Sequence, residues 1–156
     1  MRVRVLAIGS RMPRWVEEAV DDYTKRLGPK LKVTLTEIPA GQRTAGRDTA
    51  RAVAVESERL LAALRADEFV VALDERGKQL STRELADWLH QRMQDGRDLV
   101  FVIGGPDGLA ADVLARSQLK LSLSRLTFPH ALVRVVLAEQ LYRAHTVLAG
   151  HPYHRD

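Results

Sequence analysis

The sequence predicts an α/β domain with a mostly parallel sheet and helices on both faces. Short apolar segments alternate with segments of helical periodicity along the whole chain. Two of the apolar segments, residues 69–73 and 99–103, are apolar at every position, which is typical of central strands covered on both sides. Strands that alternate with helices favour parallel pairing, because each helix returns the chain to the same edge of the sheet.

Elements in the first half are bounded by residues that usually begin and end them. Pro13 suits the first turn of a helix, since its missing N–H costs nothing there, and Gly28 with Pro29 stops that helix. Asp48 is expected to cap the next helix. In order, the predicted elements are a buried strand at 3–8, a helix at 13–27, a strand with one wet face at 31–36, a small basic loop at 39–46 and a helix at 48–65.

The second half repeats the alternation. Ser81 and Glu84 form a capping box, in which the hydroxyl and the carboxylate satisfy free N–H groups at a helix start. Glycines at 96 and 150 are expected to end helices. In order, the predicted elements are a strand at 69–73 that ends at Asp74 before a turn at Gly77, a helix at 81–95, a strand at 99–103, a short helix at 110–116, a strand at 119–123 and a long helix at 131–149.

Composition limits the classes of protein to which this chain can belong. With 156 residues, 46% hydrophobic and 28% charged, it has the profile of a single globular domain spanning residues 1–156. No apolar run approaches the roughly 18 residues that a membrane span needs, and without cysteine there is neither a disulfide nor a thiolate metal site. Membrane, disulfide-rich secreted and disordered classes are therefore excluded, and a cytoplasmic location is expected.

The net charge of +4 leaves two interpretations open. A chain with 24 basic and 20 acidic residues can carry a solvated surface of mixed sign, or it can bind nucleic acid through local basic clusters. Two basic sets with few nearby acids favour the second interpretation. They are Arg43, Arg47 and Arg51, and, towards the C-terminus, Arg134, Arg143, His151, His154 and Arg155.

Ligands of open α/β sheets bind beyond the carboxyl ends of the parallel strands, where loops converge. Three segments qualify: 73–74, 104–108 and 124–130. The glycines of 104–108 allow the backbone to approach a ligand closely, but the segment is neither G-x-G-x-x-G nor a P-loop, so an ordinary tight turn is equally consistent. Residues 122–130 can hold a planar ring between apolar side chains, or can simply lead from an edge strand into a helix.

The last helix and the tail carry further candidates. The helix is apolar on most of its circumference, so it lies deep in the core or faces another subunit. Glu139 and Arg143, four residues apart on it, either form a helix-stabilising ion pair or line a site. Residues 151–156 suit stacking on a base and contact with phosphate, although tails are usually frayed. Zinc is disfavoured because only two histidines are close and cysteine is absent, so no metal is expected.

Four collinear segments together resemble one family. They are Gly-Gly-Pro-Asp-Gly at 104–108, Leu-Ser-Leu-Ser-Arg-Leu-Thr-Phe-Pro-His at 121–130, Leu-Val-Arg-Val-Val-Leu-Ala-Glu-Gln-Leu-Tyr-Arg-Ala at 132–144 and His-Pro-Tyr-His-Arg at 151–155. The chain resembles the bacterial large-subunit ribosomal RNA pseudouridine N3-methyltransferases, minimal members of the SPOUT superfamily. The likeness spans the whole chain, including residues 12–15 and 38–41 near the start.

The resemblance implies features that general rules do not predict. Family members have a C-terminal trefoil knot, whereas an unknotted sheet is the default for any α/β sequence. They are homodimers with the knot-forming helix at the interface, and they bind S-adenosyl-L-methionine in the knotted loops. Carried over to this chain, the cofactor site comprises Leu73, Gly104, Leu123, Ser124, Arg125, Leu126, Thr127 and Phe128.

The implied reaction requires the ring nitrogen of a pseudouridine in ribosomal RNA, on free RNA or on the ribosome, to lose its proton. Candidate bases are Glu139, His154 and His130. Arg143 and Arg155 are expected to hold phosphate or developing negative charge, and Tyr153 to stack on the base. The expected catalytic group is therefore Glu139, Arg143, Tyr153, His154 and Arg155.

Two positions depart from the family pattern. Asp107 stands where members commonly have Glu, and His145 where an apolar or aromatic residue is usual. His145 is either a satisfied interface histidine or an extra RNA contact.

Three other functions stay open. The alternatives are a SPOUT methyltransferase acting on transfer RNA, a non-catalytic ribosome-associated module, and a flavodoxin-like enzyme binding a nucleotide at 104–108. Cofactor binding and salt-dependent RNA binding discriminate among them.

Overall fold

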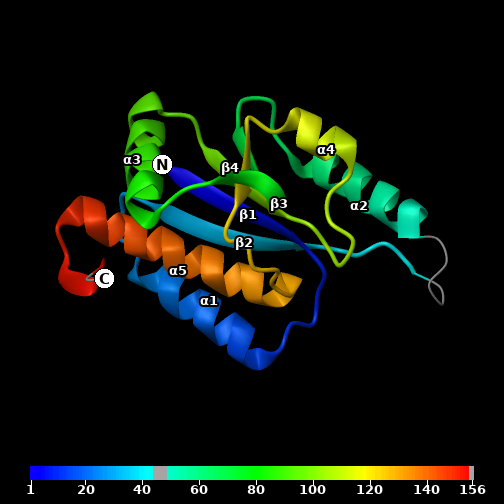
Figure 1. The fold of residues 1–156 in the computed structure, drawn as a ribbon, viewed down its shortest axis with the longest axis horizontal. Helices are drawn as coiled ribbons and strands as arrows, with labels where there is room; N and C mark the ends of the chain where they lie inside the picture. The colour runs from blue at the N-terminus through cyan, green and yellow to red at the C-terminus, as the bar shows by residue number, and fades with distance from the viewer. Residues whose placement is uncertain (44–48, 155–156) are drawn as a thin grey trace.

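The computed structural model describes residues 1–43 and 49–154, apart from the side chain of His154, and arranges five strands of this part in one sheet (Figure 1). The strand order is β2-β1-β4-β3-β5, and all four pairings are parallel. The strands are β1 (Arg2–Ile8), β2 (Lys32–Ile38), β3 (Phe69–Gln79), β4 (Leu99–Ile103) and β5 (Leu119–Ser122). The predicted parallel α/β architecture is confirmed.

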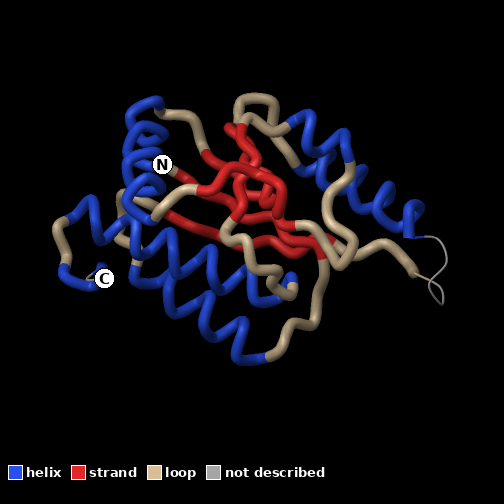
Figure 2. The backbone as a smooth tube through the Cα atoms, in the orientation of Figure 1, coloured by secondary structure: helices blue, strands red, loops and turns tan. Residues whose placement is uncertain are grey.

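Helices cover both faces of the sheet (Figure 2). Helices α1 (Arg14–Arg26), α3 (Thr82–Asp95) and α5 (His130–Ala149) pack on one face, where Phe101 belongs to their core cluster. Helices α2 (Thr49–Ala63) and α4 (Ala111–Arg116) pack on the other, against Val102. Because neighbouring residues of a strand point to opposite faces, the apolar run of β4 supplies both clusters at once.

Several local predictions are confirmed by the structure. All five residues of β4 are buried, and β3 lies between β4 and β5, as expected of covered strands. The capping box at Ser81 is formed: its Oγ accepts the Glu84 N–H at 3.1 Å, and Glu84 Oε1 accepts the Ser81 N–H at 2.8 Å. Gly96 ends α3 in the left-handed region with φ of 83°.

Other boundaries differ from the prediction. The strand expected to end at Leu73 continues to Gln79, because β5 pairs again with β3 after a register shift between Leu73 and Lys78. The strand expected to reach Leu123 ends at Ser122, and α2 ends at Ala63 rather than Arg65. Asp48, the predicted cap of α2, lies outside the described residues, as do residues 44–46 of the predicted loop.

Arg134 is a buried residue paired with a carboxylate, so its assignment to a basic set with few nearby acids is wrong. Its side chain is 3% exposed, and it pairs with Glu37 Oε2 at 2.6 Å. Its Nη2 also donates to the carbonyl oxygens of Ile8 at 3.3 Å and Gly9 at 3.0 Å. These bonds attach the first turns of α5 to the carboxyl ends of β1 and β2, and so position the start of α5 against the sheet.

None of the helices in the described part of the chain is both long enough and apolar enough to cross a lipid bilayer.

His145 packs within the chain, beside the end of α1. A Cβ placed on Gly28 would lie 3.8 Å from its Nε2. Burial, and secondarily the Lys30 ammonium, lowers the pKa of His145 below its usual range. Folding therefore favours the neutral form of this imidazole.

We expect stability to decrease with acidification because of His145. An unfolded histidine protonates near pH 6.5, so below that pH the unfolded state binds more protons than the folded state and stability falls as pH falls. H145Q should flatten this dependence, measured as the urea midpoint at pH 7.5 and pH 5.5. H90Q, at an exposed position of α3, is the control and should keep the wild-type slope. An unchanged slope in H145Q would contradict the assignment.

Candidate active site

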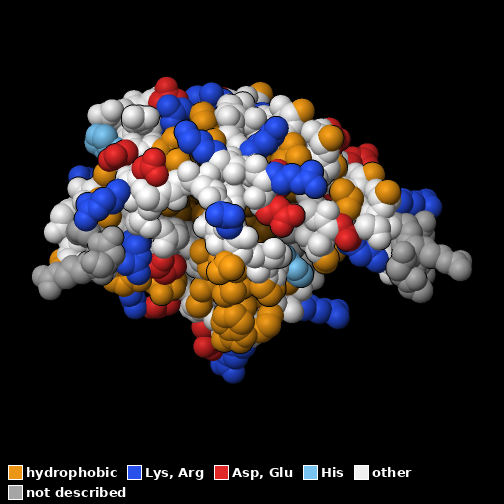
Figure 3. All heavy atoms as spheres, viewed as in Figure 1, with side chains coloured by type: hydrophobic (Ala, Val, Ile, Leu, Met, Phe, Trp, Pro, Cys, Tyr) orange, Lys and Arg blue, Asp and Glu red, His pale blue; other side chains and the backbone are white. Residues whose placement is uncertain are grey.

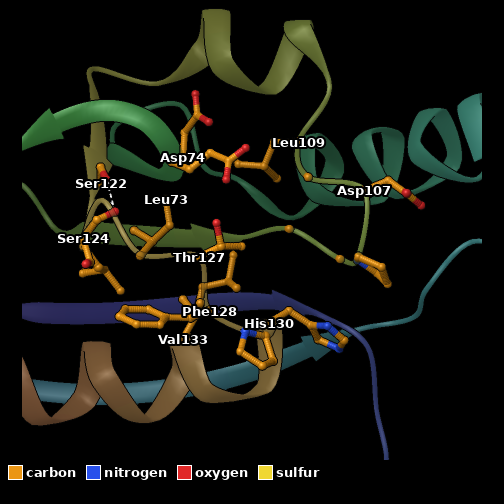
Figure 4. A pocket seen from close by; sticks show the side chains of 18 of the residues that line it. Leu73, Asp74, Asp107, Leu109, Ser122, Ser124, Thr127, Phe128, His130 and Val133 are labelled. Atoms are coloured by element: carbon orange, nitrogen blue, oxygen red, sulfur yellow. Dashed lines mark hydrogen bonds between the residues drawn. The ribbon is translucent and has the colours of Figure 1, made fainter.

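A cavity of about 590 Å³ opens at the carboxyl edge of the sheet. Its walls come from residues 73–75 of β3, from residues 103–109 at and after the end of β4, and from residues 122–124, 126–130 and 133, which run from the end of β5 into α5 (Figure 4). This volume is in the range of small-molecule and cofactor sites. The three strand-end segments singled out from the sequence thus line one cavity.

The first wall exists because β3 bulges. Leu121 of β5 pairs with both Leu73 and Lys78, so the residues between these two leave the ladder. Gly77 permits the return, since a Cβ there would lie only 2.6 Å from the carbonyl carbon of Lys120. The bulge brings Asp74 and Glu75 to the cavity, and the Arg76 N–H donates to Asp74 Oδ1 at 3.3 Å.

The second wall is the glycine-rich segment 104–108, which is a tight turn and a cavity wall at the same time. The Gly108 N–H donates to the Gly105 carbonyl at 3.1 Å, and Gly108 has φ of 79°. A Cβ on Gly104 would lie 2.8 Å from the carbonyl carbon of Gly108. A side chain at Gly104 would force the turn apart, and one at Gly108 would be strained by the positive φ, so the turn requires glycine at both positions.

The third wall is a polar turn that follows β5. Ser122 Oγ donates to the Ser124 carbonyl at 2.9 Å, and Ser124 Oγ accepts the Leu126 N–H at 2.9 Å. Of the eight cofactor residues implied by the resemblance, seven line the cavity and Arg125 is not among the lining residues. The seven are Leu73, Gly104, Leu123, Ser124, Leu126, Thr127 and Phe128.

The donor set of this cavity fits S-adenosylmethionine. Leu73, Leu123 and Phe128 offer apolar surfaces for a planar base, and the backbone of two loops offers N–H and C=O groups to its edge. The carboxylates of Asp74 and Glu75 suit a ligand that carries positive charge on a sulfonium and an ammonium. Four lining residues, Glu75, Ile103, Leu109 and Val133, lie outside the segments selected from the sequence, and the first three are adjacent to one of them.

A second cluster lies further along α5. Glu139 Oε2 accepts from Arg143 Nε at 3.0 Å and from the Tyr153 hydroxyl at 2.9 Å, while Glu139 Oε1 accepts from Gln140 Nε2 at 2.7 Å. The Arg143 guanidinium lies 5.0 Å from the centre of the Tyr153 ring. The ion pair that the spacing allowed is therefore formed within α5. The Tyr153 hydroxyl, which bonds to the same carboxylate, ties the short 3₁₀ turn Pro152–His154 to α5.

Tyr153 is a hydrogen-bond donor in this cluster. Burial first, then its neighbours Tyr23 and Glu139, raises the pKa of its hydroxyl well above the usual value. A tyrosine held neutral donates to a carboxylate and does not act as a base. The side chain of His154 and the whole of Arg155 lie outside the described residues, so the structure places neither of these two predicted catalytic side chains.

Within one chain the cavity and the cluster are separate. His130 and Val133 of α5 line the cavity, whereas Glu139 and Arg143 do not. At about 1.5 Å per residue, Glu139 lies about 9 Å and Arg143 about 15 Å beyond Val133 along the helix axis. The structure thus brings together seven predicted cofactor residues, and separately three predicted catalytic residues.

The structure also describes two of the three arginines of the first basic set, Arg43 and Arg51. Arg43 pairs with Glu56 and Asp107, so its assignment to a set with few nearby acids is wrong. Arg51 is exposed, and Arg47 lies outside the described residues. Among residues 1–43 and 49–153, no three His, Cys, Asp or Glu side chains are grouped in a way that could hold a metal ion.

Comparisons with known proteins identify the class to which this fold and cavity belong. A family model described as "Predicted SPOUT methyltransferase" matches residues 1–154. The chain therefore belongs to the SPOUT methyltransferase family, and this membership implies the C-terminal trefoil knot.

Two relatives of high sequence identity show which members of the SPOUT methyltransferase family this chain is similar to. The chain is 55% identical to a protein of Alkalilimnicola ehrlichii over 99% of both chains, and 51% identical to one of Thiobacillus denitrificans over 100% of both. Both relatives are named "Ribosomal RNA large subunit methyltransferase H".

Solved structures share the fold. A probable methyltransferase from Bordetella pertussis Tohama I aligns with a TM-score of 0.59 and 19% identity, covering 92% of this chain and 94% of that one. A probable methylase family protein from Haemophilus influenzae Rd KW20 aligns with a TM-score of 0.57 and 14% identity, covering 99% of this chain and 70% of that one.

Proposed function

We propose that this protein transfers a methyl group from S-adenosyl-L-methionine to N3 of a pseudouridine in large-subunit ribosomal RNA. The observation that carries the proposal is the cavity at the carboxyl edge of the sheet, walled by three loops of a SPOUT fold. The names of relatives about half identical over their full length support ribosomal RNA as the substrate. The assembled ribosome in the bacterial cytoplasm is the proposed setting.

When bound, S-adenosylmethionine supplies a methyl group that its positive sulfur has already activated. The task of the chain is to orient donor and acceptor and to exclude water. Leu73, Leu123 and Phe128 would hold the base of the donor, with backbone groups of 104–108 and 122–128 at its edge. Arg125 lies in the same turn, between the lining residues Ser124 and Leu126, and is proposed to contact the donor from the edge of the cavity.

The acceptor nitrogen must lose a proton, and the described residues differ in their capacity to take it. Glu139 already accepts three hydrogen bonds, so its carboxylate holds Arg143 and Tyr153 in place. His130 lines the cavity and is one candidate to accept the proton of a bound base. His154, one residue beyond Tyr153, is the other candidate, with Arg143 and Arg155 balancing negative charge on RNA.

A homodimer accounts for the separation between the cavity and the cluster of Glu139, Arg143 and Tyr153. Residues that are apart in one chain meet if the tail of one protomer completes the cavity of its partner. The surface of α5 and α1 favours such pairing: hydrophobic side chains gather over these helices in Figure 3. Leu132, Val135 and Val136 of α5 are only half-buried, and Trp15 of α1 is 56% exposed. A face of this kind is typical of an interface between copies.

The first test combines cofactor binding with identification of the product. Calorimetry should detect S-adenosylmethionine binding to the purified protein. Mass spectrometry of ribosomal RNA from cells without the gene should show one pseudouridine lacking its N3 methyl group, restored by the wild-type gene. Loss of methylation on transfer RNA instead, or absence of cofactor binding, would contradict the proposal.

The second test asks whether the tail acts across the dimer. H154A/R155A and G104V should each lose methyl transfer, the first with cofactor affinity intact and the second without it. Because half of randomly mixed dimers are heterodimers with one intact site, co-refolded variants should regain about a quarter of wild-type activity. Each variant refolded alone is the control. An inactive mixture whose heterodimers are verified by mass would exclude catalysis in trans.

A further inference from the structure

A buried carboxylate that the proposed chemistry does not use lies next to the cavity. Glu56 of α2 is 2% exposed, and its Oε2 accepts from the Gly41 N–H at 2.9 Å and from Arg43 Nη1 at 2.7 Å. Arg43 Nη2 donates to Oε1 at 3.2 Å. A buried carboxylate needs such partners, because an uncompensated charge is strongly destabilising there. Glu56 therefore holds residues 41–43 in a fixed position over α2.

Arg43 extends this contact to the cavity wall. Its Nε donates to Asp107 Oδ2 at 2.8 Å, and Asp107 belongs to the glycine-rich turn 104–108. Figure 4 shows the Asp107 carboxylate pointing away from the other labelled side chains of the cavity. The two carboxylates raise the pKa of the Arg43 guanidinium further above its usual range, so the arginine is charged at all relevant pH values.

Glu56 also packs directly beneath the same turn. A Cβ placed on Gly105 would lie 3.4 Å from Glu56 Oε1 and 3.1 Å from Ile8 Cγ2. The Glu56 carboxylate thus contacts the turn at Gly105, and Arg43, its ion-pair partner, binds the turn at Asp107. Neither Glu56 nor Arg43 is among the residues that line the cavity.

We propose that Glu56, Arg43 and Asp107 are positioning residues that hold turn 104–108 in the conformation that binds the methyl donor. The inference rests on the proposed function, since it assigns these residues to the cofactor cavity. A turn with three glycines in five residues has wide conformational freedom, and affinity falls in proportion to the fraction of molecules in the competent conformation. The ion-pair network restricts that freedom from outside the cavity.

The chain offers a matched control for this network. Arg4 pairs with Glu68 at 2.6 Å, with side chains 19% and 2% exposed, and the Arg43–Glu56 pair at 2.7 Å has side chains 22% and 2% exposed. Glu68 immediately precedes β3, so the Arg4 pair lies at the amino edge of the sheet, opposite the cavity. Removing either arginine leaves a buried carboxylate unpaired, but only Arg43 is connected to the turn.

The experiment compares S-adenosylmethionine affinity, measured by calorimetry, with thermal stability. R43Q and R4Q should both lower the melting temperature, whereas only R43Q should weaken binding, by about tenfold if the competent conformation becomes a tenth as populated. D107A, which leaves the Arg43–Glu56 pair intact, should weaken binding similarly with little loss of stability. D107E should bind S-adenosylmethionine about as tightly as wild type, because the longer side chain still carries a carboxylate that can reach Arg43.

The double variant R43Q/D107A separates positioning from direct contact. If Arg43 and Asp107 act as one unit, R43Q/D107A should bind S-adenosylmethionine no more weakly than the single variant with the lower affinity. Equal affinity of R43Q and wild type, equal loss in R4Q and R43Q, or additive losses in the double variant would each overturn the proposal. If wild type itself does not bind S-adenosylmethionine, the proposed function fails and this inference falls with it.

Discussion

The double pairing of one β5 residue is the constraint on which the candidate site depends. Leu121 faces both Leu73 and Lys78, so β3 must bulge between them, and Gly77 is the residue whose missing side chain lets the chain return to the ladder. Without the bulge, Asp74 and Glu75 would continue along the strand. With it, they become the wall of a cavity whose other walls follow from parallel alignment alone, because β3, β4 and β5 all end at the same edge.

Helix α5 links the two candidate functional regions of the chain. Its first turns line the cavity with His130 and Val133, and buried Arg134 fixes those turns to the ends of β1 and β2. Its later turns carry the cluster of Glu139, Arg143 and Tyr153. A rigid helix keeps these regions at a constant separation, and the proposed second protomer would bring the tail of one chain to the cavity of the other.

The parts of this account that sequence predicted are those with local physical signals. Apolar runs, capping residues and terminal glycines identified the strands and helices, and strand ends identified the three loops. The features that the sequence did not predict depend on contacts between residues far apart along the chain. The bulge in β3 depends on pairing with β5, and Arg43 and Arg134 looked free because their partners Glu56 and Glu37 are distant in sequence. The knot and the roles of the tail residues came only from resemblance, because general rules disfavour threading.

The central claim is that three strand-end loops of this sheet enclose the methyl donor. A crystal structure of the protein with S-adenosylmethionine tests it most directly. We expect the donor between residues 73–75, 104–108 and 122–130, with its base against Leu73, Leu123 and Phe128 and the turn at 104–108 unchanged. Density for the donor at another place on the molecule, or none at saturating concentration, would contradict it.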